Sequence, residues 1–287
     1  HAADDSEEVD ADAADRARLV LRICDETIQA HPGSIGAMQC ANLAEGIRSK
    51  RLNISVEQAV LPNRPWIAGI SWRNAEKAWI KVVPTTLKEI EEMNRIGAEA
   101  RWARLISRKP LLEQVVTLPL KDDYREHRSD WIAEGLPIGH YAVIGSLSPD
   151  FVYQSAQQLT FFQCTELAGA THSRDRRHYA AIVHRETGAP IAGVRVEYGQ
   201  FDYRKGKYEI AATQTTDADG EANATLPRNG NYRILATRGA DSVYIGEFYS
   251  SDQGRDRQSD MLFAHFFTDR ALYRPGQTIY FKAVLYR

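Results

Sequence analysis

The spacing of apolar residues along the chain predicts helices first and β-strands afterwards. Apolar residues recur at helical spacing over residues 15–30, where a His-Pro-Gly sequence ends the run. Ser34 can cap a second helix. The apolar stripe of that helix is made of Cys40, Leu43, Ala44 and Ile47. We therefore predict a helical hairpin over residues 14–50. Two helices bury little apolar surface alone, so we expect this hairpin either to pack on the domain that follows or to continue a helical region upstream.

The residues before this hairpin have a different character. They read HAADDSEEVDADA, which is acidic and lacks any large apolar cluster, so we predict that residues 1–13 are disordered. The chain begins with His rather than Met. We therefore expect that an earlier start, able to carry a signal peptide or a lipid anchor, has been removed.

From residue 51 the pattern becomes that of β-strands. Short runs rich in Val, Ile and Trp are separated by Pro, Asn and charged turn residues. The predicted strands are NISVEQAVL, RPWIAGISWR, KAWIKVVP, LLEQVVTLPL, SDWIAEGL, HYAVIGSLS and QLTFFQCTEL. Helical spacing returns at residues 86–109, which we predict to be a helical insertion. The number of strands predicts a β-sandwich over residues 51–167.

A second β-sandwich is predicted over residues 168–259. The polar stretch LAGATHSRDRR resembles a linker, and YAAIVHRETGAPIAGVRVEYG then gives a strand, a turn and another strand. Alternation places Val194, Val196 and Tyr198 on one face of that second strand. We predict that TQTTDADGEANATL forms a hairpin around Asp219-Gly220. After a polar linker, residues 260–287 would begin a third, truncated unit.

Composition and charge exclude some classes of partner. The chain has 287 residues, of which 43% are hydrophobic, enough to fill real cores. Its 36 basic and 38 acidic side chains give a formal net charge of -2, so no long-range positive field would attract nucleic acid or an anionic membrane. The chain contains no apolar run of 18 residues. We expect no nucleic-acid partner, and membrane attachment only through a lipid anchor upstream.

The cysteines leave one question open. Cys24, Cys40 and Cys164 are too few for a disulfide scaffold and contain no C-x-x-C pair for zinc or thiol redox chemistry. Cys24 and Cys40 lie about equally far from the Pro32-Gly33 turn, so an antiparallel helix pair could bring them together. A disulfide would require the two helix faces to meet. Two buried thiols are the interpretation we favour.

Two groups of residues could in principle hold a metal. His172, His178 and His184 are evenly spaced, but a third ligand is uncertain, and we interpret them as histidines that face solvent. The sequence Asp217-Ala218-Asp219-Gly220 opens like a calcium loop. The loop then has Ala222 where a Gly is needed and Arg228 where a bidentate Glu is needed. A hairpin turn is the better interpretation.

No arrangement of residues predicts an enzyme. The chain contains no nucleophile elbow, P-loop or G-x-G-x-x-G sequence, and the carboxylates of Glu89, Glu91 and Glu92 are typical of a solvated helix face. The tryptophans could form a platform for stacking sugars, but most occupy alternating strand positions, which favours core filling. These tryptophans are Trp66, Trp72, Trp79, Trp102 and Trp131. We nominate no catalytic, cofactor-binding or metal-binding residue and expect no cofactor.

The last segment carries a resemblance to a known family. Tyr273-Arg274-Pro275-Gly276 is a turn signal, and FFTDRALYRPGQTIYFKAVLYR resembles the strand-turn-strand that opens a macroglobulin domain in bacterial alpha-2-macroglobulins. In that family an Asp-Arg, a Tyr-Arg-Pro-Gly and a Phe-Lys occur in this order. HRETGAPIAGVRVEYG and TTDADGEANATL are similar to the preceding macroglobulin domain. The helical pair, NISVEQAVLPNRPW and SDWIAEGLPIGHYAVIGS resemble the amino-terminal region of large forms from Bacteroidetes-type bacteria.

This resemblance implies a fold and a function. The fold would be mainly β, with tandem macroglobulin-type sandwiches of immunoglobulin or fibronectin kind after a short helical hairpin. Members of the family are periplasmic or surface proteins, often lipid-anchored, that trap endoproteases after cleavage of a bait region. Many acylate the protease through a Cys-Gly-Glu-Gln thioester, which this chain lacks, since Cys164-Thr165-Glu166-Leu167 shares only the Cys and a Glu.

The family resemblance therefore implies an amino-terminal structural scaffold. Target endoproteases would be partners only of the full-length protein, and further macroglobulin domains would be partners within it. The alternative is a cell-surface module that binds a glycan or a partner protein. An opening hairpin without its remaining strands would expose apolar residues, so we expect Ile279, Phe281 and Leu285 to pack on the preceding domain or to be poorly ordered.

Overall fold

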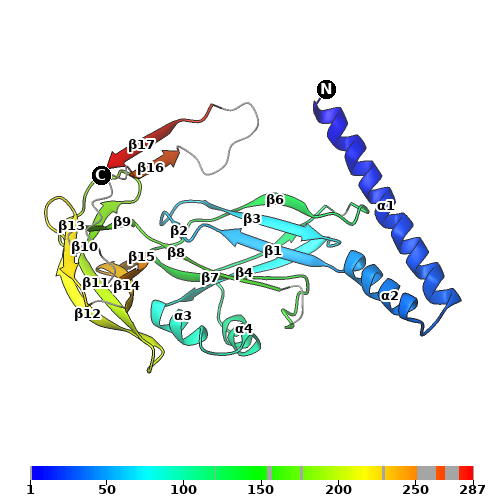
Figure 1. Cartoon of the computed structure of the whole chain (residues 1–287), viewed down its shortest axis with the longest axis horizontal. Helices are drawn as coiled ribbons and strands as arrows, with labels where there is room; N and C mark the ends of the chain where they lie inside the picture. The colour runs from blue at the N-terminus through cyan, green and yellow to red at the C-terminus, as the bar shows by residue number, and fades with distance from the viewer. Residues whose placement is uncertain are drawn as a thin grey trace.

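The computed structural model describes residues 2–119, 121–153, 157–174, 177–227, 230–250, 263–268 and 278–286. Figure 1 shows a helical hairpin at one end, a first β-sandwich beside it, and a second β-sandwich at the other end. The protein is mainly β, built of tandem antiparallel sandwiches after a helical hairpin, so the predicted fold class is confirmed. Among the described residues, no helix is both long and apolar enough to cross a membrane.

The helical hairpin is longer than predicted. Its helices are α1 (Ala2–Ala30) and α2 (Ile35–Arg48). Helix α1 begins at Ala2, so it includes residues 2–13 of the segment that we predicted to be disordered. Alanine has high helix propensity, and this local preference does not need a large apolar cluster. At the start of α2, the Ser34 Oγ accepts a hydrogen bond from the Ala37 amide at 3.1 Å, as the capping prediction requires.

The hairpin packs on the first sandwich, as expected. Its small apolar core holds Leu21, Cys24 and Ala44, with Cys40, Ile47 and Tyr124 against them. Leu43 was predicted to share this core but is 52% exposed. Two side chains of the sandwich form hydrogen bonds to the end of α2. The Arg73 Nη2 donates to the Gly46 carbonyl at 2.7 Å, and the Asn74 Nδ2 donates to the Ile47 carbonyl at 2.8 Å.

The first sandwich consists of two sheets that enclose one core. The three-stranded sheet has the order β1 (Arg51–Val56), β3 (Trp66–Arg73) and β6 (His127–Ala133). The five-stranded sheet has the order β2 (Ala59–Val60), β8 (Gln157–Cys164), β7 (Gly139–Ser146), β4 (Lys77–Thr85) and β5 (Leu112–Thr117). Neighbouring strands are antiparallel except β2 and β8, which are parallel. Each of the seven predicted runs contains a strand, because alternation marks strands with one buried face.

The insertion at residues 86–109 is helical, but it forms two helices. These are α3 (Leu87–Met93) and α4 (Ala98–Ile106), separated by a turn that ends at Gly97. Met93, Trp102 and Leu105 are at most 3% exposed because they pack on the outer face of the five-stranded sheet. That sheet is therefore covered on both faces, and α3 is held at the end of the sandwich nearest the second domain (Figure 1).

The second sandwich also has two sheets. One sheet has the order β13 (Glu221–Thr225), β10 (Arg177–His184) and β9 (Leu167–Arg174). The other has the order β12 (Lys207–Thr215), β11 (Arg195–Asp202), β14 (Gly230–Arg238) and β15 (Asp241–Ser250). Val194, Val196 and Tyr198 are fully buried in the core, which confirms that they share one face.

Two predictions for this sandwich are wrong. The stretch LAGATHSRDRR was predicted to be a linker, but it contributes β9, and Leu167 is 1% exposed in the second core. The stretch is polar because β9 lies at the edge of its sheet, where fewer of its side chains are buried. The stretch TQTTDADGEANATL does not form a hairpin either. β12 pairs with β11, whereas β13 pairs with β10, so the Asp219-Gly220 turn carries the chain from one sheet to the other.

The last described element is a hairpin of β16 (Phe263–Thr268) and β17 (Phe281–Tyr286). The exposed fractions of Ile279, Phe281 and Leu285 are 53%, 67% and 60%. Of the two alternatives expected for these residues, packing on the preceding domain or poor order, the first is therefore not what the structure shows. The predicted turn Tyr273-Arg274-Pro275-Gly276 lies outside the described residues.

Candidate functional site

The junction between the two sandwiches brings together the polar side chains that sequence reasoning did not connect. Helix α3 and strands β7 and β8 of the first sandwich form one side of this junction. Strands β14 and β15 of the second sandwich form the other side. We therefore take this junction as the candidate functional site.

Glu91 on α3 is the central side chain of the junction. Its Oε1 accepts one hydrogen bond from the Arg233 guanidinium on β14 and one from the Tyr244 hydroxyl on β15, the latter at 2.8 Å. The Arg233 guanidinium lies 4.0 Å from the ring centroid of Tyr208 and 4.8 Å from that of Tyr244. The Arg233 side chain is 18% exposed, so this ion pair is shielded from much of the solvent. Burial raises the pKa of Tyr244, which keeps its hydroxyl a donor.

Further contacts extend the junction on both sides of Glu91. The Arg95 Nη2 donates to the Gly206 carbonyl at 3.2 Å, and Arg64 forms an ion pair with Glu186 at 2.7 Å. Near the start of β15, the His140 Nε2 lies 2.9 Å from the Ser242 Oγ. Burial lowers the pKa of His140, so its imidazole is neutral near pH 7. The first sandwich is therefore bonded to the second at several separate points.

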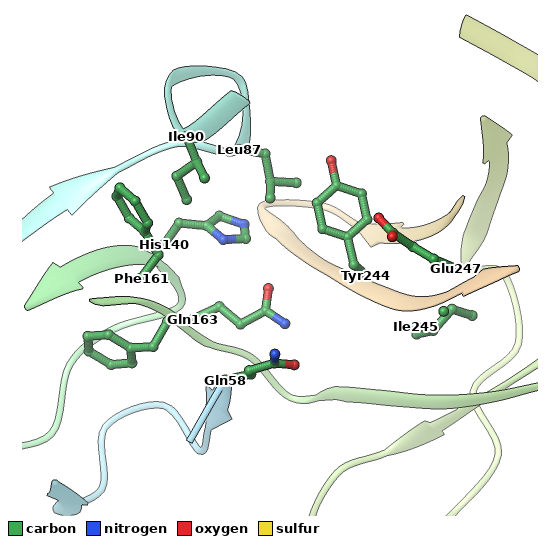
Figure 2. Close-up of a pocket in the computed structure, with 11 residues that line it drawn as sticks. Gln58, Leu87, Ile90, His140, Phe161, Gln163, Tyr244, Ile245 and Glu247 are labelled. Atoms are coloured by element: carbon green, nitrogen blue, oxygen red, sulfur yellow. The ribbon is translucent and has the colours of Figure 1, made fainter. Parts of the chain in front are cut away.

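A cleft of about 580 Å³ opens along this junction. Figure 2 shows Gln58, His140 and Gln163 on one side of it and Tyr244 and Glu247 on the opposite side. Leu87, Ile90 and the two phenylalanines of β8 add apolar surface. Amide, carboxylate and aromatic groups of this kind can bind a polar ligand or a peptide.

The residues considered as metal ligands do not converge. His172 stacks on Tyr179 with ring centroids 4.7 Å apart, and the His178 Nδ1 lies 2.8 Å from the Ser173 Oγ. His184 accepts a hydrogen bond from the Thr187 amide at 3.3 Å. In the part of the chain that the structure describes, no group of three His, Cys, Asp or Glu side chains could hold a metal ion.

The sequence Asp217-Ala218-Asp219-Gly220 uses its first carboxylate for backbone bonds. The Asp217 Oδ1 accepts hydrogen bonds from the Asp219 amide at 3.0 Å and from the Glu221 amide at 2.9 Å. Gly220 has a positive φ of 74°. The residues thus form a tight turn, although the turn joins two sheets.

The tryptophans fill the core of the first sandwich and its covered face, as predicted. Trp66, Trp72, Trp102 and Trp131 are at most 4% exposed, and Trp79 is half-buried against the residues around α3 and α4. The Trp102 Nε1 donates to the Phe151 carbonyl at 2.7 Å, which satisfies its polar atom. The four buried rings offer no open face for stacking a sugar.

Cys164 is placed where it cannot react readily. It is 1% exposed in the first core, and burial raises the pKa of its thiol to about 12.

Sequence reasoning missed Glu91, Arg233 and Tyr244. Glu91 was interpreted as part of a solvated helix face with Glu89 and Glu92. It is separated from its partners by 142 and 153 residues, so no local pattern could reveal the contact.

The fold and the junction together define a class of protein, namely tandem antiparallel β-sandwiches joined by a polar interface. No family model matches the chain, and a search of curated proteins finds no match. Solved structures do match. Native alpha-2-macroglobulin from Escherichia coli spanning domains MG0-NIE-MG1 has a TM-score of 0.50 and 13% sequence identity, over 68% of this chain and 63% of that one.

A shorter fragment of the same Escherichia coli protein, spanning domains NIE-MG1, also matches. It has a TM-score of 0.50 and 13% identity, and the match covers 69% of this chain and 97% of that chain. At this identity the likeness shows the fold alone. The chain thus covers less than two thirds of the length of the three-domain structure and nearly all of the two-domain one.

Proposed function

We propose that this chain is an amino-terminal structural scaffold of a bacterial alpha-2-macroglobulin that traps and inhibits endoproteases. The likeness to the two Escherichia coli fragments supports the family, and the segment TDRALYRPGQTIYFKAVLYR adds the resemblance to the opening of a following macroglobulin domain. The large Bacteroidetes-type form is proposed from the resemblance of the helical pair, NISVEQAVLPNRPW and SDWIAEGLPIGHYAVIGS to its amino-terminal region. In this proposal the protein is not an enzyme. It acts at the periplasm or the cell surface, where the full-length protein would meet its target proteases.

The observation that carries this proposal is the bonded junction between the sandwiches. A scaffold must hold consecutive domains in a fixed relation, and here the insertion of the first domain bonds the second through Glu91, Arg233 and Tyr244. Among the described residues, no three acidic, His or Cys side chains gather at a metal-binding distance. The chain would therefore position machinery located elsewhere in the protein.

The direct test is a protease-inhibition assay on the isolated chain. We expect no stoichiometric inhibition of a panel of serine, cysteine and metalloendoproteases, because no bait region or thioester sequence can be identified in the chain. Residual protease activity against a protein substrate is the measurement, and far-UV circular dichroism confirms that the tested chain is folded. Stoichiometric loss of activity with any of these proteases contradicts the scaffold assignment.

The junction cleft supports a second candidate, a cell-surface module that binds a glycan or a partner protein. Since the tryptophans are buried, such binding would use the Gln58 and Gln163 amides and the aromatic rings around them. Binding to a glycan or peptide array that is lost in Gln163→Ala would favour this candidate over a purely structural role.

A further inference from the structure

Two of the three cysteines meet inside the helical hairpin. Cys24 on α1 is 2% exposed, and Cys40 on α2 is half-buried. Both pack in the small core that Leu21 and Ala44 also share, and both are free thiols in this structure. The condition for a disulfide between them, that the two helix faces meet, is therefore satisfied.

We propose that Cys24 and Cys40 form a disulfide that links the two helices of the hairpin, with an oxidised disulfide carrier as the electron acceptor. The pairing is specific to this place, since Cys164 lies alone in the core of the first sandwich. The inference depends only on the hairpin and holds whether or not the chain is a macroglobulin scaffold.

The exposure of the two thiols sets the order of the chemical steps. Cys40 is the more accessible thiol, so its thiolate attacks one sulfur of the carrier disulfide, and one carrier thiolate leaves and takes up a proton. Cys24 then loses its proton and attacks the Cys40 Sγ, which breaks the mixed disulfide and releases the second carrier thiol. The protein loses two electrons and two protons, and the carrier disulfide becomes two thiols.

The hairpin has a physical reason to need such a link. Among the side chains that the structure describes, only a few apolar ones are buried between α1 and α2, so their packing alone supplies little stability. A cross-link removes conformational freedom from the unfolded hairpin, which favours the folded state. Disulfides of this kind form and persist in oxidising compartments.

The test uses the intact chain in its native state. The chain is incubated with an excess of oxidised glutathione, then denatured, alkylated without reductant and digested with trypsin. Both cysteines lie on the single tryptic peptide of residues 23–48, because no Lys or Arg occurs between Arg22 and Arg48. We expect this peptide to carry no alkyl group and to be lighter by two hydrogen atoms, whereas Cys164 is alkylated.

Two results would overturn the inference. One is alkylation of both cysteines in the peptide after oxidation, and the other is a glutathione adduct that persists on wild-type Cys40. In Cys24→Ala the second step is blocked, so we expect a stable glutathione adduct on Cys40. The matched control Cys164→Ala should close the disulfide as wild type does. The wild-type measurement needs no substitution, so a variant that misfolds leaves the inference testable.

Discussion

At the scale of single residues, burial decides the charge of the side chains at the junction. His140 is half-buried beside Ser242, and its pKa is lowered mainly by desolvation, although nearby Asp241 acts in the opposite direction. When the folded state keeps this histidine neutral, the unfolded state binds a proton more readily as the pH falls, and stability is lost. The junction should therefore weaken when the solution becomes acidic.

We expect His140→Gln to flatten the pH dependence of stability. The folded pKa is below the ordinary value of 6.5, so the contribution of neutral His140 is complete above pH 6.5 and is lost as the pH falls towards the folded pKa. Glutamine can still bond Ser242 but does not titrate. Urea unfolding at a series of pH values below neutral measures the effect.

The control for this experiment is Ser242→Ala. It removes the hydrogen-bond partner but leaves the titrating imidazole, so stability should fall at every pH while the slope stays that of wild type. A His140→Gln variant with the slope of wild type would show that protonation of His140 does not weaken the folded state.

At the scale of elements, the crossover turn at Gly220 determines how the second sandwich is connected. It carries the chain from β12 to β13, in the other sheet. A Cβ at Gly220 would lie 2.5 Å from the Ile182 carbonyl oxygen and 3.1 Å from the Ile191 amide nitrogen, in addition to the strain of a φ of +74°. These contacts are with backbone atoms, which cannot move away cheaply.

Gly188 provides a matched comparison because it has a φ of +71° with no atom within 4 Å of an added Cβ. We expect Gly188→Ala to cost about 1 kcal/mol, the strain of a positive φ alone. Gly220→Ala should cost about 3 kcal/mol or more, since the backbone must also shift. The free energy of unfolding in urea distinguishes the two. Equal losses would mean that the close contacts at Gly220 relax without cost.

The same elements show how far sequence reasoning reached. The strands of the first sandwich, and β10 and β11 of the second, followed from alternating apolar residues, because that period reports which face is buried. The partner of each strand did not follow, since Asp219-Gly220 is as good a turn for a crossover as for a hairpin. The edge strand β9 was mistaken for a linker because only part of one face is buried, at residues such as Leu167.

At the scale of the whole molecule, the sequence could predict the two sandwiches but not their junction. Contacts such as Glu91 with Arg233 join residues far apart in the chain, and a carboxylate on an amphipathic helix has the same local signature whether it faces water or another domain. The helical insertion was predicted, yet its role became visible only in the fold. It is the part of the first domain that reaches the second at Arg233 and Tyr244.

Glu91→Ala should therefore uncouple the two sandwiches. In this variant both Arg233 and Tyr244 lose the carboxylate that accepts their hydrogen bonds. Leaving the partly buried Arg233 guanidinium without this acceptor should lower the free energy of unfolding by about 1.5–3 kcal/mol. The matched control is Glu92→Ala, on the same helix. The Glu92 carboxylate forms an exposed ion pair with Arg104 at 3.4 Å, and a pair of this kind stabilises the fold by less than about 1 kcal/mol.

The positions of the tryptophans provide the measurement, because all five lie at or before Trp131, in the first sandwich. Tryptophan fluorescence in urea then follows the first sandwich alone, whereas far-UV circular dichroism follows both. In the wild type and in Glu92→Ala we expect the two transitions to coincide, since the bonded junction makes the sandwiches unfold together. In Glu91→Ala they should separate. Coincident transitions in Glu91→Ala, at the wild-type midpoint, would show that this ion pair does not couple the domains.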